Sequence, residues 1–106
     1  MLDSTNTKTT KLLTLADYIE SLPANAIAMD MYMSGCGTKG CIAGWAVYRE
    51  YGIVPTRGVA DIAEKLLEMT LDESGKLFFD YPYHVTQAKV VSVLRKFALT
   101  NVIDWS

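Results

Sequence analysis

The chain has 106 residues, a length that suits one domain with a single modest core. Half of its residues are hydrophobic and 21% are charged, a balance typical of globular proteins and not of disordered chains. The net charge of −2 excludes both the basic surplus of most nucleic-acid-binding proteins and the strong acidity of a nucleic-acid mimic, so we expect no nucleic-acid partner.

The N-terminus is mostly polar and lacks the basic-then-apolar order of a signal peptide. We expect residues 1–8 to form a disordered tail ahead of a single helical domain over 9–106. No apolar run approaches the roughly 18–20 residues that cross a bilayer. The sequence therefore predicts a cytoplasmic protein with no membrane partner, in which a structural disulfide is not expected.

The first predicted helix begins at a cap formed by Thr9 or Thr10 and ends before Pro23. Apolar residues recur there at three- and four-residue spacing, as in an amphipathic helix. Over 26–33 the spacing changes to two, which favours a short extended segment, with a helical turn capped by Asn25 as the alternative. The apolar stripe of the helix consists of Leu12, Leu15, Ala16, Ile19 and Leu22.

Residues 41–51 are apolar on almost every side, which predicts a buried central helix closed by Gly52. A third amphipathic helix is predicted over 59–67. A fourth, short helix is expected to run from a cap at Asp72 to Phe78.

The last predicted helix is the most clearly marked, with Thr86 as its N-cap and Asn101 at its end. The whole pattern predicts a mainly α, compact single domain of four to five helices. These helices would surround the one at about 41–51, with at most a short extended segment near 26–33. We expect an apolar tail to fold back onto the core; it consists of Val102, Ile103 and Trp105.

The stretch from Ser34 to Trp45 contains four of the seven glycines and both cysteines of the chain. Such clustering occurs in phosphate-binding loops, in redox or metal sites, and in loops that turn tightly before a helix. The candidate ligand or thiol loop consists of Cys36, Gly37, Thr38, Lys39, Gly40 and Cys41.

The segment Gly35–Gly40 fits the G-x-G-x-x-G pattern of dinucleotide-binding proteins, and Asp61 lies about twenty residues further on, where a ribose-binding acid would stand. However, nothing after residue 52 resembles the buried strands of a parallel sheet. The P-loop pattern requires Ser or Thr after its lysine, and Gly40 follows Lys39. We therefore expect no cofactor, while an anion held by the backbone amides before the helix at Cys41 remains open.

Cys36 and Cys41 are five residues apart, unlike the C-x-x-C pairs of redox and zinc sites. His84 is the only histidine and supplies at most a third zinc ligand, so no metal is expected. A buried Cys41 is favoured over a reactive one, whereas Cys36 is the better candidate for an exposed thiol. Nucleophilic catalysis would need His84 beside one of these thiols; we predict no catalytic residues.

Several motifs share their order and spacing with a known family. They are Leu15-Ala16-Asp17, Cys36-Gly37-Thr38-Lys39-Gly40-Cys41-Ile42-Ala43-Gly44-Trp45, the helix at 60–71, Leu77-Phe78, Val85-Thr86-Gln87-Ala88, Val93-Leu94-Arg95 and Asp104-Trp105. Over residues 12–105 the chain resembles small uncharacterised bacterial and bacteriophage proteins that carry a C-G-T-x-x-C-I-A-G-W motif. The resemblance implies a bacterial or phage cytoplasm and an accessory gene, and it brings no activity, cofactor or catalytic residue.

The sequence thus predicts a small non-enzymatic accessory protein that acts by protein–protein interaction. Its most specific form is a phage-encoded modulator of host machinery or host defence, with a host protein as partner; a homodimer is also open. The alternative is an anion, small-ligand or thiol-based sensor built on Gly35–Cys41. The predicted partner surface consists of Met29, Met31, Met33, Tyr81, Tyr83 and Trp105.

Overall fold

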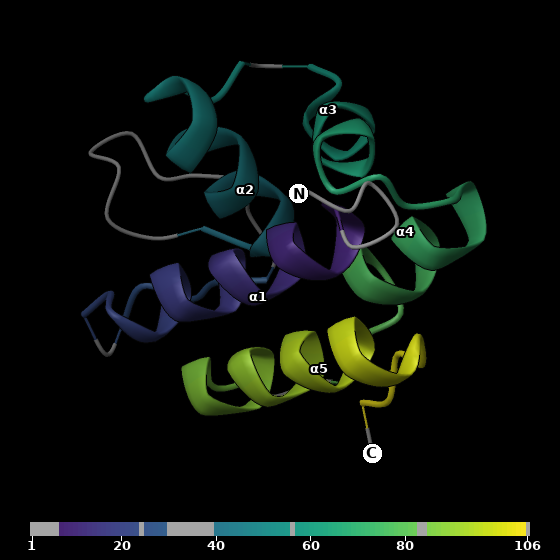
Figure 1. Cartoon of the computed structure of the whole chain (residues 1–106). Coiled ribbons are helices and arrows are strands. Elements are labelled where there is room, and N and C mark those ends of the chain that lie inside the picture. Colours follow the sequence, from purple (N-terminus) through teal and green to yellow (C-terminus); the bar gives the residue numbers. More distant parts are fainter. Residues whose placement is uncertain (1–6, 24, 30–39, 56, 83–84, 106) are drawn as a thin grey trace, which may run out of the picture.

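The computed structural model of the chain describes residues 7–23, 25–29, 40–55, 57–82 and 85–105 (Figure 1). These ranges contain five α-helices and no strand, so the predicted mainly α fold is confirmed. None of these helices is long and apolar enough to cross a membrane. The helices are α1 (Thr7–Glu20), α2 (Ile42–Tyr51), α3 (Val59–Leu66), α4 (Leu71–Phe78) and α5 (Gln87–Thr100).

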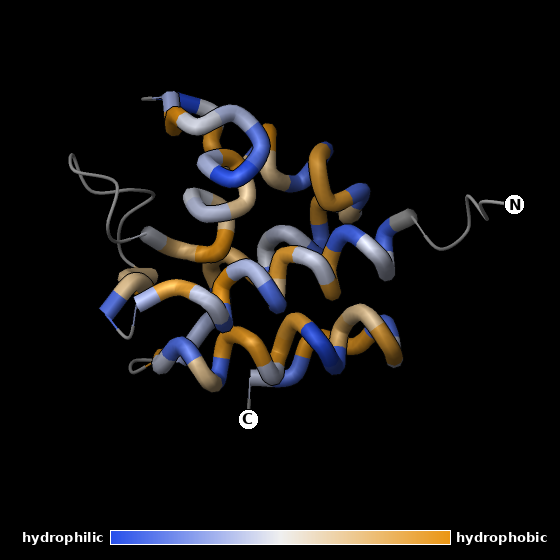
Figure 2. Tube along the Cα trace, turned by 60° about the vertical axis from the view of Figure 1, so that its left-hand side comes forward, coloured by the Kyte–Doolittle hydropathy of each residue, from blue (hydrophilic) through white to orange (hydrophobic). Residues whose placement is uncertain are grey.

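The two longest helices, α1 and α5, lie side by side and run in opposite directions (Figure 1). Near one end of the pair, the Thr9 hydroxyl donates to the Ala98 carbonyl at 3.2 Å. Near the other end, the Gln87 amide donates to the carbonyls of Ile19 and Leu22 at 2.6 and 2.8 Å, which satisfies acceptors at the end of α1. Hydrophobic and hydrophilic residues alternate along both long helices, as Figure 2 shows. The buried residues between them include Leu12, Leu15, Ala16, Ile19, Val90, Val93, Leu94 and Phe97.

The predicted central helix is α2, which packs against α3, while α4 contacts both. Its residues Ile42–Val47 are all buried, as its apolar composition predicts. Burial ends before Arg49, so the C-terminal part of α2 reaches the surface. Gly52 closes the helix at a φ of 74°, a left-handed conformation that glycine adopts without steric cost.

The structure corrects one predicted helix start and confirms another. The cap of α4 is Thr70 and not Asp72, because Thr70 forms a reciprocal capping box with Glu73. The α5 cap is Thr86, as predicted, and its side chain accepts from the Lys89 amide at 3.1 Å. Asn101 ends α5 at a φ of 62°, also as predicted.

The two ends of the described chain lie against α4. α1 begins at Thr7, earlier than the predicted cap at Thr9 or Thr10, since Lys8 is held by Glu73 on α4 at 2.6 Å. Residues 7 and 8 therefore belong to the helix and not to the predicted tail, whose first six residues lie outside the described ranges.

The apolar C-terminal tail folds back in part. Ile103 and Trp105 are half-buried against the core, and the Trp105 indole nitrogen donates to the Lys76 carbonyl at 3.0 Å. Val102 is 51% exposed, so the prediction is wrong for this residue.

Glu73 is expected to stabilise the fold both through its cap and through its ion pair. Partial burial raises the pKa of Glu73, but hydrogen bonds from Lys8 and the Thr70 amide and the Lys8 charge outweigh burial, so that the pKa lies below its ordinary value. Glu73→Ala removes both contacts and should lower the free energy of unfolding by about 1–2 kcal/mol, measured by urea denaturation.

Glu73→Gln serves as the matched variant, because glutamine preserves the capping box and loses only the charge. A depressed carboxyl pKa stabilises the folded state above the unfolded pKa, and this contribution is lost as the pH falls through the folded value. The difference between wild type and Glu73→Gln should therefore shrink below about pH 4. A difference that is constant from pH 7 to about pH 3 would contradict the ion-pair assignment.

Candidate functional site

A short β-bridge closes the base of the candidate ligand or thiol loop, which we call the glycine–cysteine loop. Ile27 and Gly40 pair in parallel, with the Gly40 amide donating to the Ala26 carbonyl and the Ala28 amide to the Gly40 carbonyl, both at 2.9 Å. The extended segment predicted near 26–33 thus consists of this isolated bridge in the described residues. Cys36, Gly37, Thr38 and Lys39 lie outside the described ranges.

Cys41 is buried at the N-terminus of α2, where its sulfur serves as the helix cap. The Gly44 amide donates to Cys41 Sγ at 3.4 Å, and the residue is only 3% exposed. Burial raises the pKa of the Cys41 thiol above its ordinary value, and the helix amides offset this only in part. The predicted burial of Cys41 is therefore confirmed, and the side chain is held as a neutral thiol.

Trp45 fixes the start of α2 to the segment before the loop. Its indole nitrogen donates to the buried Ala26 carbonyl at 2.8 Å. Its ring also packs edge-on against Tyr18 of α1 and Tyr48, with centroid distances of 6.0 and 5.6 Å. One carbonyl thus accepts both the bridge from Gly40 and the indole of Trp45.

Other motifs that carry the family resemblance also meet in space. Arg95 on α5 pairs with Asp17 and Glu20 on α1, at 2.8 Å in each case. Gln87 bonds to the last carbonyls of α1, as described above. Each of these motif residues therefore has a structural contact that accounts for it.

Three residues of the predicted partner surface lie within the described ranges, and each is half-buried: Met29, Tyr81 and Trp105. Met31, Met33 and Tyr83 lie outside the described ranges. Met29 packs against the core close to the bridge that closes the loop, whereas Trp105 bonds to the end of α4. In Figure 1 the segment before the grey loop lies at the left and the chain end at the lower right.

Four large apolar side chains are exposed on, or just after, α4 and α5. The ammonium of Lys8 joins these elements, lying 2.6 Å from Glu73 Oε1 and 3.4 Å from Asn101 Oδ1. Trp105 joins them a second time through the Lys76 carbonyl. We call this region the C-terminal surface; its exposed side chains are Leu71 (78%), Phe79 (60%), Leu99 (72%) and Val102 (51%).

Sequence reasoning did not identify the C-terminal surface, although one signal was present. Leu71 and Phe79 flank the amphipathic stripe of α4, whose buried residues are Ser74, Leu77 and Phe78. Phe79 does not fit the helical spacing of that stripe, which marks it as an apolar residue facing away from the core, whereas Leu71, three residues before Ser74 and seven before Phe78, does fit it, so its exposure at the start of α4 could not be predicted from spacing.

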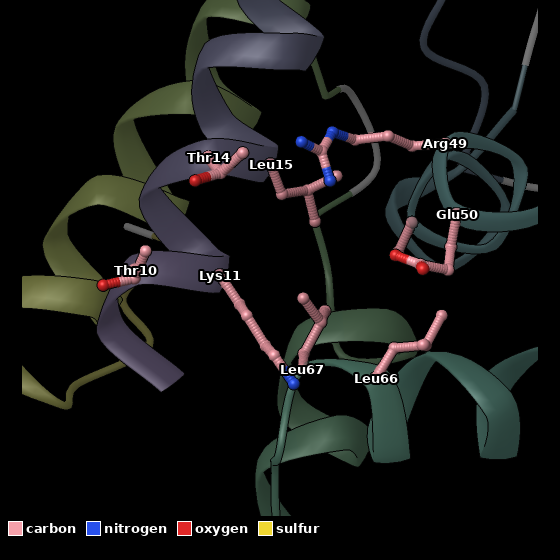
Figure 3. Close-up of a pocket in the computed structure, with 9 residues that line it drawn as sticks. Thr10, Lys11, Thr14, Leu15, Arg49, Glu50, Leu66 and Leu67 are labelled. Carbon is pink, nitrogen blue, oxygen red and sulfur yellow. The ribbon is translucent and has the colours of Figure 1, made fainter. Parts of the chain in front are cut away.

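A cleft opens where α1, α2 and the end of α3 meet, with a volume of about 370 Å³ (Figure 3). We call it the interhelical cleft. Its apolar part comes from all three helices and the residue after α3, and its polar groups come from α1 and α2. The lining residues are Thr10, Lys11, Thr14, Leu15, Ala46, Arg49, Glu50, Leu66 and Leu67.

The described residues contain no group of three or more His, Cys, Asp or Glu side chains that could hold a metal ion. His84 and Cys36 lie outside the described ranges, so the arrangement of a cysteine–histidine pair is not described. Comparison of the chain with family models, curated proteins and solved structures gave no match. The family suggested by the motifs therefore stays a prediction.

The buried Cys41 should resist labelling in the folded protein. In a Cys36→Ser variant, which leaves Cys41 as the only thiol, a mild thiol reagent at pH 8 should react with the native protein far more slowly than with the protein in urea. Rapid reaction in the native state would show that the thiol is accessible, and would contradict the capping role.

Trp45→Phe should destabilise the protein more than Trp105→Phe. The first change leaves the buried Ala26 carbonyl with one partner fewer and a small void, which costs about 2–3 kcal/mol. The second removes a hydrogen bond in a half-buried tail and should cost about 1 kcal/mol or less. Urea denaturation followed by far-UV circular dichroism measures both, and equal losses would contradict the anchoring role of Trp45.

Proposed function

We propose that this protein acts by binding another protein, and that the C-terminal surface makes the contact. The observation that carries this proposal is the exposure of four large apolar side chains on, or just after, α4 and α5. Apolar side chains gathered on neighbouring elements are typical of interaction surfaces, while singly scattered ones are common on any protein.

The energetics favour covering this surface. Burying one large apolar side chain contributes about 1.5–3 kcal/mol. Phe79 is the strongest candidate for an anchor, because aromatic side chains contribute much of the binding energy at interfaces. Lys76 and Asp72 pair at 3.3 Å on the exposed side of α4 and would form part of a polar rim.

The setting implied by the family resemblance makes this proposal more specific. A phage-encoded modulator of host machinery or host defence, acting in the bacterial cytoplasm, needs a binding surface and no chemistry of its own. A host protein is the proposed partner. Self-association through the same surface is the competing outcome, and analytical ultracentrifugation separates the two.

The alternative, a sensor built on Gly35–Cys41, has less support. Cys41 is buried, and the Gly40 amide is already bonded to the Ala26 carbonyl, so neither group is free for a ligand. What is left of this alternative depends on residues 35–39, which lie outside the described ranges.

The test compares matched surface variants in a pull-down from bacterial lysate. Phe79→Ser should weaken capture of a stoichiometric partner by about thirtyfold or more, as expected for loss of a 2 kcal/mol anchor. Ile53→Ser is the control, because Ile53 is 69% exposed in the turn after α2. Both variants should fold normally, since exposed positions change stability by only about 0.5 kcal/mol. Capture that is unchanged in Phe79→Ser, or weakened equally in Ile53→Ser, would contradict the proposal.

A further inference from the structure

The interhelical cleft contains an arginine that pairs with no carboxylate of the described residues. In the described part of the chain, five cations pair with a carboxylate, namely Lys8, Lys11, Lys76, Arg95 and Lys96, whereas Arg49, like Arg57 and Lys65, is in no ion pair. Instead, the Arg49 guanidinium lies 5.8 Å from the centre of the Tyr18 ring on α1. This contact across two helices orients the side chain, and Figure 3 shows the guanidinium beside Leu15 within the cleft.

A guanidinium held in this way suits an oxyanion, either a carboxylate or a phosphate. Its planar set of donors matches the two oxygens of a carboxylate, which it binds with parallel hydrogen bonds. The orientation by Tyr18 lowers the entropy lost when such a group binds. Arg49 can therefore accept the carboxylate of a ligand that enters the cleft.

Glu50 gives the cleft an opposite charge. Figure 3 shows its carboxylate turned into the cleft from α2, and no cation pairs with it among the described residues. Lys11 does not balance Glu50, since its ammonium lies 3.0 Å from Glu68. A ligand with two negative charges would be repelled by Glu50, and a simple cation would be repelled by Arg49.

The rest of the cleft is small and partly apolar. Leu15, Ala46, Leu66 and Leu67 contribute the apolar surface from three sides, and Thr10, Lys11 and Thr14 of α1 complete the lining. A volume of about 370 Å³ is near the lower end of the roughly 300–1,000 Å³ of known ligand sites. The cleft therefore suits a small molecule with an apolar body.

We propose that the interhelical cleft binds a small zwitterion with an apolar side chain, the chemistry of a free aliphatic α-amino acid. The carboxylate pairs with Arg49, the ammonium group pairs with Glu50, and the side chain packs against the leucines. The cleft shares no residue with the C-terminal surface, so this proposal does not rest on the proposed protein contact.

The test is a titration of the ¹⁵N-labelled protein with L-leucine and two analogues, followed by amide chemical shifts. The first analogue, 4-methylpentanoate, lacks the ammonium group, and the second, 3-methylbutylamine, lacks the carboxylate. Leucine should shift the amides of the cleft-lining residues saturably, with a dissociation constant of about 1 mM as expected for a half-open site. Each analogue should bind about tenfold more weakly.

Two cleft variants assign the charges. Arg49→Gln should weaken leucine binding about tenfold without weakening 3-methylbutylamine, whereas Glu50→Gln should weaken leucine without weakening 4-methylpentanoate. Arg57→Gln, on the exposed segment before α3, is the control and should bind leucine normally. All three positions are exposed. Amides far from each substitution should keep their wild-type chemical shifts, which shows that the variant is folded.

Three results would overturn the proposal. One is the absence of saturable shifts with leucine, and another is equal binding of leucine and both analogues. The third is an equal effect of Arg49→Gln and Arg57→Gln, which would mean that leucine binding depends only on the net charge of the protein. None of these results changes the expected effect of Phe79→Ser on protein binding, so the two proposals fail separately.

Discussion

The antiparallel packing of α1 on α5 is the constraint on which the rest of the structure depends. It joins residues near the two ends of the chain, such as Lys8 and Asn101, which are 93 positions apart. Closing so long a loop costs conformational entropy, which the apolar faces of both helices offset by burial. On the other side of α1 from α5, Tyr18 meets Trp45 of α2 (Figure 1), and α3 and α4 pack in turn against α2.

The described end of the glycine–cysteine loop, Gly40 and Cys41, has a structural role in this packing. Its end must enter the core at Ile42, so the backbone on both sides of Ile42 needs hydrogen-bond partners away from water. The Ala26 carbonyl and the Cys41 sulfur supply them, to Gly40 and Gly44 respectively. The burial that satisfies this need also suppresses ionisation of the Cys41 thiol, which separates the anchoring of α2 from thiol chemistry at this position.

The helices could be predicted from the sequence because their apolar spacing and their caps are local. The α4 cap shows the limit, since both Thr70 and Asp72 are capping residues. Only Thr70 has a glutamate three positions later, and that pattern favours it. The interhelical cleft could not be predicted, because Arg49 enters it only through its contact with Tyr18, and this contact depends on how α1 and α2 pack.

The distribution of charge explains why a cleft with unpaired charges can persist in this fold. The pairs of Lys8 with Glu73 and Arg95 with Asp17 and Glu20 join separate elements, so their contacts contribute to holding those elements together. Arg49 and Glu50 lie where α2 leaves the core, and no element is held by either of them through an ion pair in the described residues. Arg49 and Glu50 can therefore form ion pairs with a ligand without breaking an ion pair that holds the helices together. Charged groups that hold no other element in place can exchange water for a ligand while the helices stay packed.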